Sequence, residues 1–195
     1  MPRLPILHET IRNLYYHVPM WWTMILLYLI AFVYSIKYLS SSKIEFDEAA
    51  SESVNIGLLF GTLGIITGMI WAKFTWGDYW TNDVHLNGAA ITILSYTAYI
   101  VLRNSFDDEQ KRARFAAVYN IFAFMLMLVF IGILPRMTDS LHPGKGGNPG
   151  FGQYDLDDQM RMVFYPAVIG WFLTGLWIYR LKLRIFRIEN NKAND

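Results

Sequence analysis

The sequence predicts an all-α membrane protein, a single polytopic domain over residues 1–195 built as a bundle of about five transmembrane helices. Hydrophobic residues make up 54% of the chain and charged residues only 17%, whereas a soluble domain carries about 25% charged residues. Five uncharged apolar runs follow one another along the chain, each close to the roughly 20 residues that a helix needs to cross a bilayer. The chain contains no cysteine, which excludes disulfide scaffolds, Cys-ligated zinc sites and iron–sulfur clusters.

The five spans are expected near residues 18–39, 54–72, 86–102, 115–134 and 162–179. The first begins with an uncharged run, and the second is uncharged throughout. The third is the shortest and is also uncharged, as are the fourth and the fifth. A buried helix of a soluble protein explains one such run, but five of them in 195 residues leave almost no polar surface. The spans therefore cross a membrane.

Basic residues are unequally divided between the two sides that this topology defines. Eleven of the 17 Lys and Arg residues fall on the side of the C-terminus, chiefly in the Arg103–Arg114 loop and the C-terminal tail. By the positive-inside rule, the C-terminus is expected to be cytoplasmic and the N-terminus outside. The formal net charge is only +1, and the basic residues form no stripe, so we expect no nucleic-acid partner.

Histidines and aromatic residues gather on the expected outer side. The four histidines are His8, His17, His85 and His142, and the aromatic stretch Trp71–Trp80 lies between spans two and three. Neutral imidazole is an axial ligand of haem iron, and indole and phenol rings stack on flat π systems. The pattern therefore indicates a haem site. An ordinary interfacial aromatic belt with solvated histidines is the alternative interpretation.

Three motifs, in the same order along the chain, resemble those of a known family. The stretch Thr67–Asp83 reads TGMIWAKFTWGDYWTND and resembles the tryptophan-rich "WWD" signature of the haem-handling proteins of cytochrome c maturation. His17-Val18-Pro19 and Leu141-His142 match two further motifs that flank this signature. Within the superfamily the chain looks most like the haem exporter protein C (CcmC) family, over roughly residues 15 to 180.

The resemblance implies a set of haem-binding residues. His17 and His142 would be the axial ligands of the iron. The haem platform would consist of Trp71, Trp76, Gly77, Tyr79, Trp80 and Asp83. His85 stands where an Arg is common, and it would meet a haem propionate or compete for the iron. Lys73, Lys145 or Arg136 would meet the propionates.

The resemblance also implies a function and partners. Haem, b-type and bound transiently without a covalent bond, would be bound and delivered at the outer, periplasmic face of the bacterial inner membrane for c-type cytochrome maturation. The haem chaperone CcmE would receive it, and the ABC-type subunits CcmA and CcmB and the small membrane protein CcmD would assist. The chain shows no nucleophile–base set or hydrolytic metal motif, so we expect no enzymatic activity.

The chain departs from the family pattern in several places. Asn82 replaces the third tryptophan of the signature, and the two tryptophans usual before the second histidine are absent at residues 138–141. We also expect five spans where six are typical of the family.

Two other functions remain open from the sequence. A haem-bearing electron-transfer subunit of a respiratory complex would place paired histidines inside its spans, and here no histidine lies near the middle of a span. A scaffold or assembly subunit of a respiratory or cytochrome-maturation complex would use the aromatic loop to bind a protein and would not bind haem itself.

Overall fold

The computed structural model describes residues 9–142 and 156–194, and every regular element within these ranges is a helix. The elements are η1 (Glu9–Asn13), α1 (Leu14–Ser41), α2 (Ile44–Trp76), α3 (Val84–Arg103), α4 (Glu109–Met127), η2 (Leu128–Ile133), α5 (Leu134–Met137) and α6 (Asp158–Asn194). Five helical stretches in the described part are long and apolar enough to cross a membrane. The predicted fold class is therefore confirmed.

Each predicted span lies inside one helical stretch of the structure. The first three lie within α1, α2 and α3, the fourth runs from α4 through η2 into α5, and the fifth lies in α6. The helices continue past the apolar runs at most of their ends. The first two turns of α2, for example, carry Glu45, Asp47 and Glu48, because an acidic first turn suits the positive end of the helix dipole.

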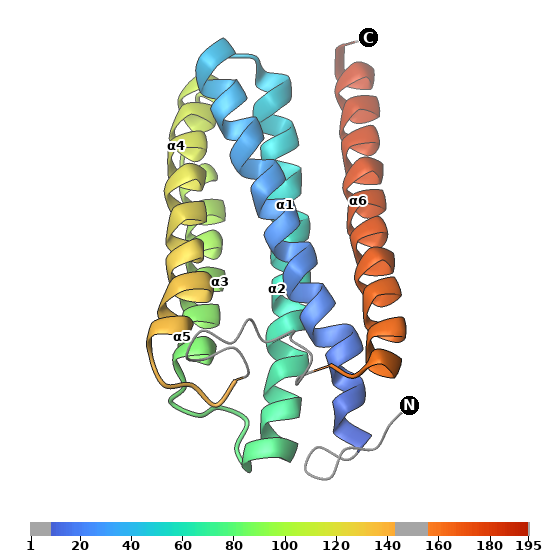
Figure 1. Cartoon of the computed structure of the whole chain (residues 1–195). Coiled ribbons are helices and arrows are strands. Elements are labelled where there is room, and N and C mark those ends of the chain that lie inside the picture. Colours follow the sequence, from blue (N-terminus) through green and yellow to red (C-terminus); the bar gives the residue numbers. More distant parts are fainter. Residues whose placement is uncertain (1–8, 143–155, 195) are drawn as a thin grey trace.

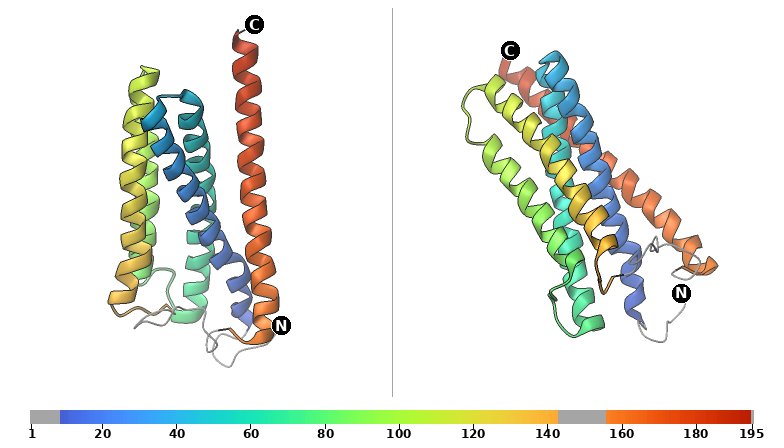
Figure 2. Two further views of the ribbon diagram at one scale, coloured as in Figure 1. Left: turned by 45° about the horizontal axis from the view of Figure 1, so that its top comes forward. Right: turned by 60° about the vertical axis from the view of Figure 1, so that its left-hand side comes forward.

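The antiparallel pair α1 and α2 forms the centre of the bundle. Helices α3 and α4 pack on one side of this pair and α6 on the other, as Figures 1 and 2 show. Within the described residues α6 packs mainly against α1 and α2. The first residues of α1 and the last residues of α6 therefore lie at opposite ends of the bundle (Figure 1).

Two ends of the bundle are thus distinguished, and we call one of them the histidine end. It comprises the start of α1, the end of α2, residues 77–83, the start of α3, α5 and residues 138–142 (Figure 1). The opposite end carries the α1–α2 turn, the α3–α4 turn and the end of α6.

A ladder of glycines on α2 lets α1 approach closely. A Cβ atom built on any of the four would collide with a large side chain of α1. The pairs are Gly57 with Tyr28, Gly61 with Met24, Gly64 with Trp21 and Gly68 with His17. Small residues at helix interfaces are typical of membrane proteins, where close van der Waals packing holds helices together. The ladder ends at the histidine end, so the packing of α1 on α2 also places His17.

A π-helical turn, η2, interrupts the helix that leads to the histidine end. Pro135 follows after one residue, at the start of α5. Proline has no N–H to donate to the preceding turn, and the wider π turn accommodates the missing bond. Gly88 of α3 lies against the carbonyl oxygen of Phe130 in this turn, so α3 and η2 are in backbone contact just before the chain reaches residues 138–142.

At the opposite end a buried ion pair joins α2 to α3. The two guanidinium nitrogens Nη1 and Nη2 of Arg103 each lie 2.6 Å from one carboxylate oxygen of Asp47. Both side chains are largely shielded from solvent, Asp47 almost completely. The bidentate geometry satisfies both oxygens of the buried carboxylate.

Candidate functional site

His17 lies in the first two turns of α1 and contacts α2 through a hydrogen bond. Its Nδ1 is 3.1 Å from Oγ1 of Thr67. The Thr67 hydroxyl donates its only hydrogen to carbonyls of its own helix, the nearer being that of Leu63 at 2.8 Å. With the hydroxyl hydrogen used in this way, the Thr67 oxygen accepts from Nδ1–H of His17, and in that tautomer the lone pair of Nε2 is available to a ligand.

Aromatic rings and a glycine fix the position of the His17 imidazole. The ring makes edge contacts with the indoles of Trp21 and Trp71, with centroids 6.3 and 5.9 Å apart. On α2, a Cβ at Gly68 would lie only 2.7 Å from Cε1 of the ring. The ring thus fits into a space that α2 leaves open by having no side chain at that position.

His142 is held by Asp83, the last residue of the signature stretch. Its Nδ1 lies 3.1 Å from Oδ1 of Asp83. The carboxylate is buried, and it also accepts a hydrogen bond from the backbone N–H of His85, which makes it the N-cap of α3. A carboxylate can only accept, so Nδ1 of His142 carries the proton and Nε2 keeps its lone pair.

The environment keeps this pair as an ionised carboxylate and a neutral imidazole. Burial by itself raises the pKa of Asp83. Hydrogen bonds from Leu141 and Ser140 and the nearby His142 lower it by more than burial raises it, so the pKa lies below its usual value. Burial lowers the pKa of His142, and the Asp83 carboxylate offsets part of that effect. A neutral imidazole is the form that ligates iron.

The ring of His142 lies between an indole and a second imidazole. Its centroid is 4.9 Å from that of Trp76 and 4.8 Å from that of His85. Nδ1 of His85 is buried and has no hydrogen-bond partner among the described residues. The imidazoles of His17, His85 and His142 are also near enough to interact electrostatically. The structure therefore brings these three predicted residues together with Trp71, Trp76 and Asp83.

Three predicted platform residues lie apart from this cluster, in the loop after α2. Gly77 has a φ of +92° and ends α2, and its N–H donates to the carbonyl of Lys73. Nothing lies within 4 Å of the place a side chain would take, so a lack of space does not explain the glycine. The left-handed backbone conformation does, because glycine adopts it without steric cost. Tyr79 and Trp80 are 54% and 40% exposed, and no described contact joins them to His17 or His142.

The side chains expected to meet propionates have different positions. Lys73 donates from Nζ to the Gly77 carbonyl at 2.6 Å and lies over the Tyr79 ring, so it also caps α2. Arg136 is exposed on α5 at the histidine end. Lys145 and His8 fall outside the described residues. Asn82, in place of the signature tryptophan, is exposed and accepts from Asn87 at 2.9 Å.

These residues fit haem better than a bare metal ion. Two imidazoles, each held through Nδ1 and each beside an indole, are the type of donor that a bis-histidine haem takes. The described part of the chain holds no group of three or more His, Cys, Asp or Glu side chains arranged around a metal ion. Nε1 of Trp71 is buried without a hydrogen-bond partner in the same part. That orphaned donor, beside His17, suits a site that receives a ligand with polar substituents.

Several residues of the site were not predicted from the sequence as site residues. Thr67, Gly68 and Ser140 orient the two histidines, and Trp21 packs on His17. The spacing of the four glycines along α2 is a detectable signal for close helix packing. The sequence alone does not show that the hydroxyls of Thr67 and Ser140 contact the site, because these contacts join residues 50 or more positions apart or depend on the fold of residues 138–142.

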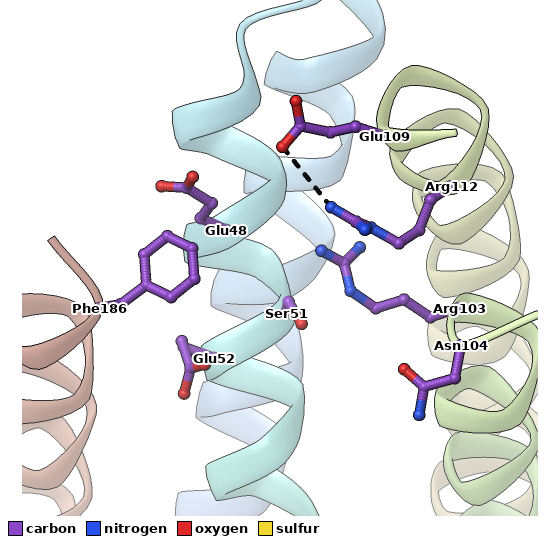
Figure 3. Close-up of a pocket in the computed structure, with 8 residues that line it drawn as sticks. All are labelled: Glu48, Ser51, Glu52, Arg103, Asn104, Glu109, Arg112 and Phe186. Carbon is purple, nitrogen blue, oxygen red and sulfur yellow. Dashed lines mark ion pairs between the residues drawn. The ribbon is translucent and has the colours of Figure 1, made fainter. Parts of the chain in front are cut away.

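A pocket of about 240 Å³ lies at the opposite end of the bundle (Figure 3). It is lined by Glu48, Ser51, Glu52, Arg103, Asn104, Glu109, Arg112 and Phe186. Arg112 pairs with Glu109 at 3.6 Å within it. It contains no histidine and no predicted site residue, so the predicted chemistry belongs to the histidine end.

Comparisons with known proteins agree with the resemblance seen in the sequence. Residues 6–194 match the family described as heme exporter protein C. The chain is 30% identical over 112 residues to the heme exporter protein C of Bradyrhizobium diazoefficiens, which covers 57% of this chain and 43% of that protein. It is 25% identical over 136 residues to the heme exporter protein C of Escherichia coli, covering 70% and 54% of the two chains.

A plant protein gives a similar match. The cytochrome c biogenesis protein CcsA of Pelargonium hortorum is 33% identical over 104 residues, covering 53% of this chain and 32% of its own length. The matched part is thus about half, or less, of the length of these relatives.

Proposed function

The chain belongs to the heme exporter protein C family, and from that premise we propose that it binds haem at its histidine end and delivers it for the maturation of c-type cytochromes. His17 and His142 would be the axial ligands, and the indoles of Trp71 and Trp76 would flank the haem. The bound haem would be b-type and transiently held.

One observation carries this proposal. Nδ1 of each histidine is hydrogen-bonded to a second residue, that of His17 to the Thr67 hydroxyl and that of His142 to the Asp83 carboxylate. Each imidazole therefore offers Nε2 with its lone pair, in an orientation fixed by a second residue. Such outer hydrogen bonds orient metal-binding histidines and raise their basicity. Two imidazoles prepared in this way, on segments far apart in the chain, are what a six-coordinate haem requires of a protein.

The location of the site suits a protein that must release the haem it binds. His142 lies on the segment after α5, at the end of the bundle, and is 25% exposed. His17, by contrast, lies in a packed helix interface. We propose that His17 is the fixed ligand and His142 the one whose contact with the iron is lost on release. Haem supplies the iron and the macrocycle, and the protein supplies ligands, orientation and a way out.

The proposal includes the surroundings that the family implies. The histidine end would face the periplasm from the bacterial inner membrane, with the C-terminus cytoplasmic. The haem chaperone CcmE would take the haem, and CcmA, CcmB and CcmD would be partners. We propose a binding and transfer role without bond cleavage, in keeping with the description of the family as a heme exporter.

The experiment is an optical spectrum and haem assay of the detergent-purified protein, with and without reconstitution. We expect the sharp Soret and α bands of six-coordinate, low-spin haem. The His17→Ala and His142→Ala variants should give five-coordinate, high-spin spectra, and the double variant should lose haem.

His85→Ala is the matched control, because it removes a third imidazole from the same cluster. We expect it to keep the low-spin spectrum. If instead His85→Ala loses low-spin haem and His142→Ala keeps it, the ligand assignment is wrong. A folded parent that takes up no haem even on reconstitution would refute haem handling and favour a scaffold that binds a partner through its exposed loop aromatics.

A further inference from the structure

The carboxylate of Asp83 accepts four hydrogen bonds. The donors are the N–H of His85 and Nδ1 of His142 on Oδ1, and the hydroxyl of Ser140 and the N–H of Leu141 on Oδ2. The four distances lie between 2.7 and 3.1 Å. Each oxygen thus accepts two bonds, and the carboxylate is saturated.

We infer that Asp83 is a positioning residue that fixes the tautomer and orientation of the His142 ring, and does not itself form part of a haem platform. The positioning of the His142 ring follows from the hydrogen bonds of Asp83 alone. Its effect on bound haem iron rests on the proposed function. The sequence predicted Asp83 as a platform residue. The structure instead buries its carboxylate behind the His142 ring, where its charge acts on a ligand through Nδ1.

The donor set explains why a carboxylate is needed at this position. All four partners donate, and an ionised carboxylate only accepts. An Asn side chain would turn an NH₂ group towards two of these donors, whichever way it was oriented. One orientation opposes Nδ1 of His142 and the N–H of His85, and the other opposes the Ser140 hydroxyl and the N–H of Leu141. The Ser140 hydroxyl and the His142 ring can each change to an acceptor, but the N–H groups of His85 and Leu141 can only donate, so Asn leaves at least one of these two N–H groups facing its NH₂ group.

The same carboxylate joins two parts of the chain that are far apart in sequence. It caps the first turn of α3, and it anchors residues 140–142 beside that turn. Ser140 adds a further bond, because its hydroxyl accepts the N–H of His142 at 3.1 Å. The direction of the His142 ring is therefore set by Asp83 at the start of α3 together with Ser140.

A second aspartate of this chain caps a helix without contacting a histidine, so it serves as a control for the capping role of Asp83. Asp108 is the N-cap of α4 and accepts from the N–H of Lys111 at 2.7 Å. It lies in the α3–α4 turn, at the end of the bundle opposite the histidines. Replacing Asp108 by Asn tests the loss of a cap carboxylate without any histidine contact.

The test compares Asp83→Asn with Asp108→Asn by two measurements. The first is the ¹⁵N NMR spectrum of histidine rings in the haem-free protein in detergent, with the His142 signal identified by its absence in His142→Ala. We expect Nδ1–H in the parent and in Asp108→Asn, and a shift towards Nε2–H in Asp83→Asn. The second is the reduction potential of bound haem, which should rise in Asp83→Asn alone, because a neutral partner makes His142 a weaker donor.

The possible results distinguish the positioning role of Asp83 from haem binding itself. An unchanged His142 tautomer and an unchanged potential in Asp83→Asn would overturn the inference while haem binding stands. A tautomer shift in a protein that never binds haem would support the positioning role and refute haem handling. If Asp83→Asn does not fold, Asp83→Ser replaces it, since Ser keeps a capping oxygen for α3 without the charge. The same tautomer shift is expected in that variant.

Discussion

At the residue scale, the two proposed ligands depend on different kinds of support. His17 is oriented by one hydroxyl of a neighbouring helix, whereas His142 is oriented by a buried charge. A hydroxyl fixes the tautomer of a histidine only because its own hydrogen is already used within the helix. The support of His17 is therefore removed by a single small substitution.

We expect Thr67→Val to weaken haem binding roughly tenfold to a hundredfold, the usual effect of losing an outer-shell hydrogen bond. Val has nearly the same shape as Thr but accepts no bond from His17. Titration of the apo-protein with haem measures the affinity. Thr67→Ser should keep it.

Thr97→Val is the control for this substitution. Thr97 donates to a carbonyl of its own helix in the same way, at 2.9 Å, and is exposed on α3. Equal haem affinities of Thr67→Val and Thr97→Val would contradict the role of Thr67.

The pKa of His142 predicts how the stability of the haem-free protein varies with pH. Burial lowers this pKa in the folded state, so below about pH 6.5 the unfolded chain binds a proton that the folded chain does not. Stability should therefore fall as the pH is lowered through this range. Asp83 has a lowered pKa, and its contribution should be lost only below about pH 3.9, as the pH falls towards its folded-state pKa.

The measurement is the thermal unfolding temperature in detergent between pH 8 and pH 3, for the parent and for His142→Ala. The difference between the two isolates His142 from the other titrating groups. A parent and a variant with parallel pH profiles between about pH 6.5 and 4 would contradict the assignment.

At the element scale, the glycine ladder of α2 makes helix packing part of the site. Gly68 is the last position of the ladder, and the residue that it accommodates is His17. The glycines of α2 thus allow both the close approach of α1 and the position of His17. A substitution that separates these helices is expected to change haem binding even though it touches no haem-binding atom.

Gly68→Ala should destabilise the protein by about 1–3 kcal/mol through overpacking and should weaken haem binding. The added methyl group would lie 2.7 Å from Cε1 of His17, so the ring or the helix must move. Chemical unfolding and haem titration measure the two effects.

Gly170→Ala on α6 is the matched control, since nothing lies within 4 Å of the new methyl group. We expect it to be neutral or slightly stabilising, because Ala favours a helix over Gly by up to about 1 kcal/mol. Loss of haem binding in both variants would show a general effect of helix substitutions.

At the scale of the whole molecule, the two ends of the bundle are stabilised differently. The histidine end is held by the hydrogen bonds of Thr67 and Asp83 to the two histidines. The opposite end is held by the buried Asp47–Arg103 pair. Removing one partner of a buried pair leaves an uncompensated charge. The opposite end is therefore expected to control stability without controlling the site.

We expect Asp47→Ala to destabilise the protein by about 3–5 kcal/mol, while the spectrum of bound haem in the folded fraction stays unchanged. Adding Arg103→Ala should recover part of the loss. Thermal unfolding in detergent gives the stability, and the optical spectrum reports on the site.

Glu109→Ala serves as the control at the same end. Its partner Arg112 lies 3.6 Å away and Glu109 is largely exposed, so removal should cost less than about 1 kcal/mol. An altered haem spectrum in Asp47→Ala would contradict the independence of the two ends.

Much of the fold was predictable from the sequence, because each span is recognised from its own residues. The five apolar runs lie inside the five helices, and the family resemblance is confirmed by the match over residues 6–194. The ends of the helices were less predictable. Helix α2 starts ten residues before its apolar run, since Glu45 and Glu48 are good helix formers and acidic residues in the first turn suit the helix dipole.

The structure brings only part of the predicted set of site residues together. His17, His85 and His142 do lie together, with Trp71 and Trp76 beside them. Tyr79 and Trp80 instead lie exposed in the loop after α2. A motif places residues near one another in sequence, but the left-handed turn at Gly77 directs the loop residues away from the end of the helix.

The sequence by itself determined the five apolar helices and the family, because length, polarity and motif are properties of contiguous residues. Only the tertiary structure decided that Nδ1 of His17 faces the Thr67 hydroxyl and that Asp83 supports His142. These depend on hydrogen bonds between residues 50 and 59 positions apart. Such bonds are set by the rotation of α1 against α2 and by the contact of residues 140–142 with α3, neither of which is encoded in any local pattern.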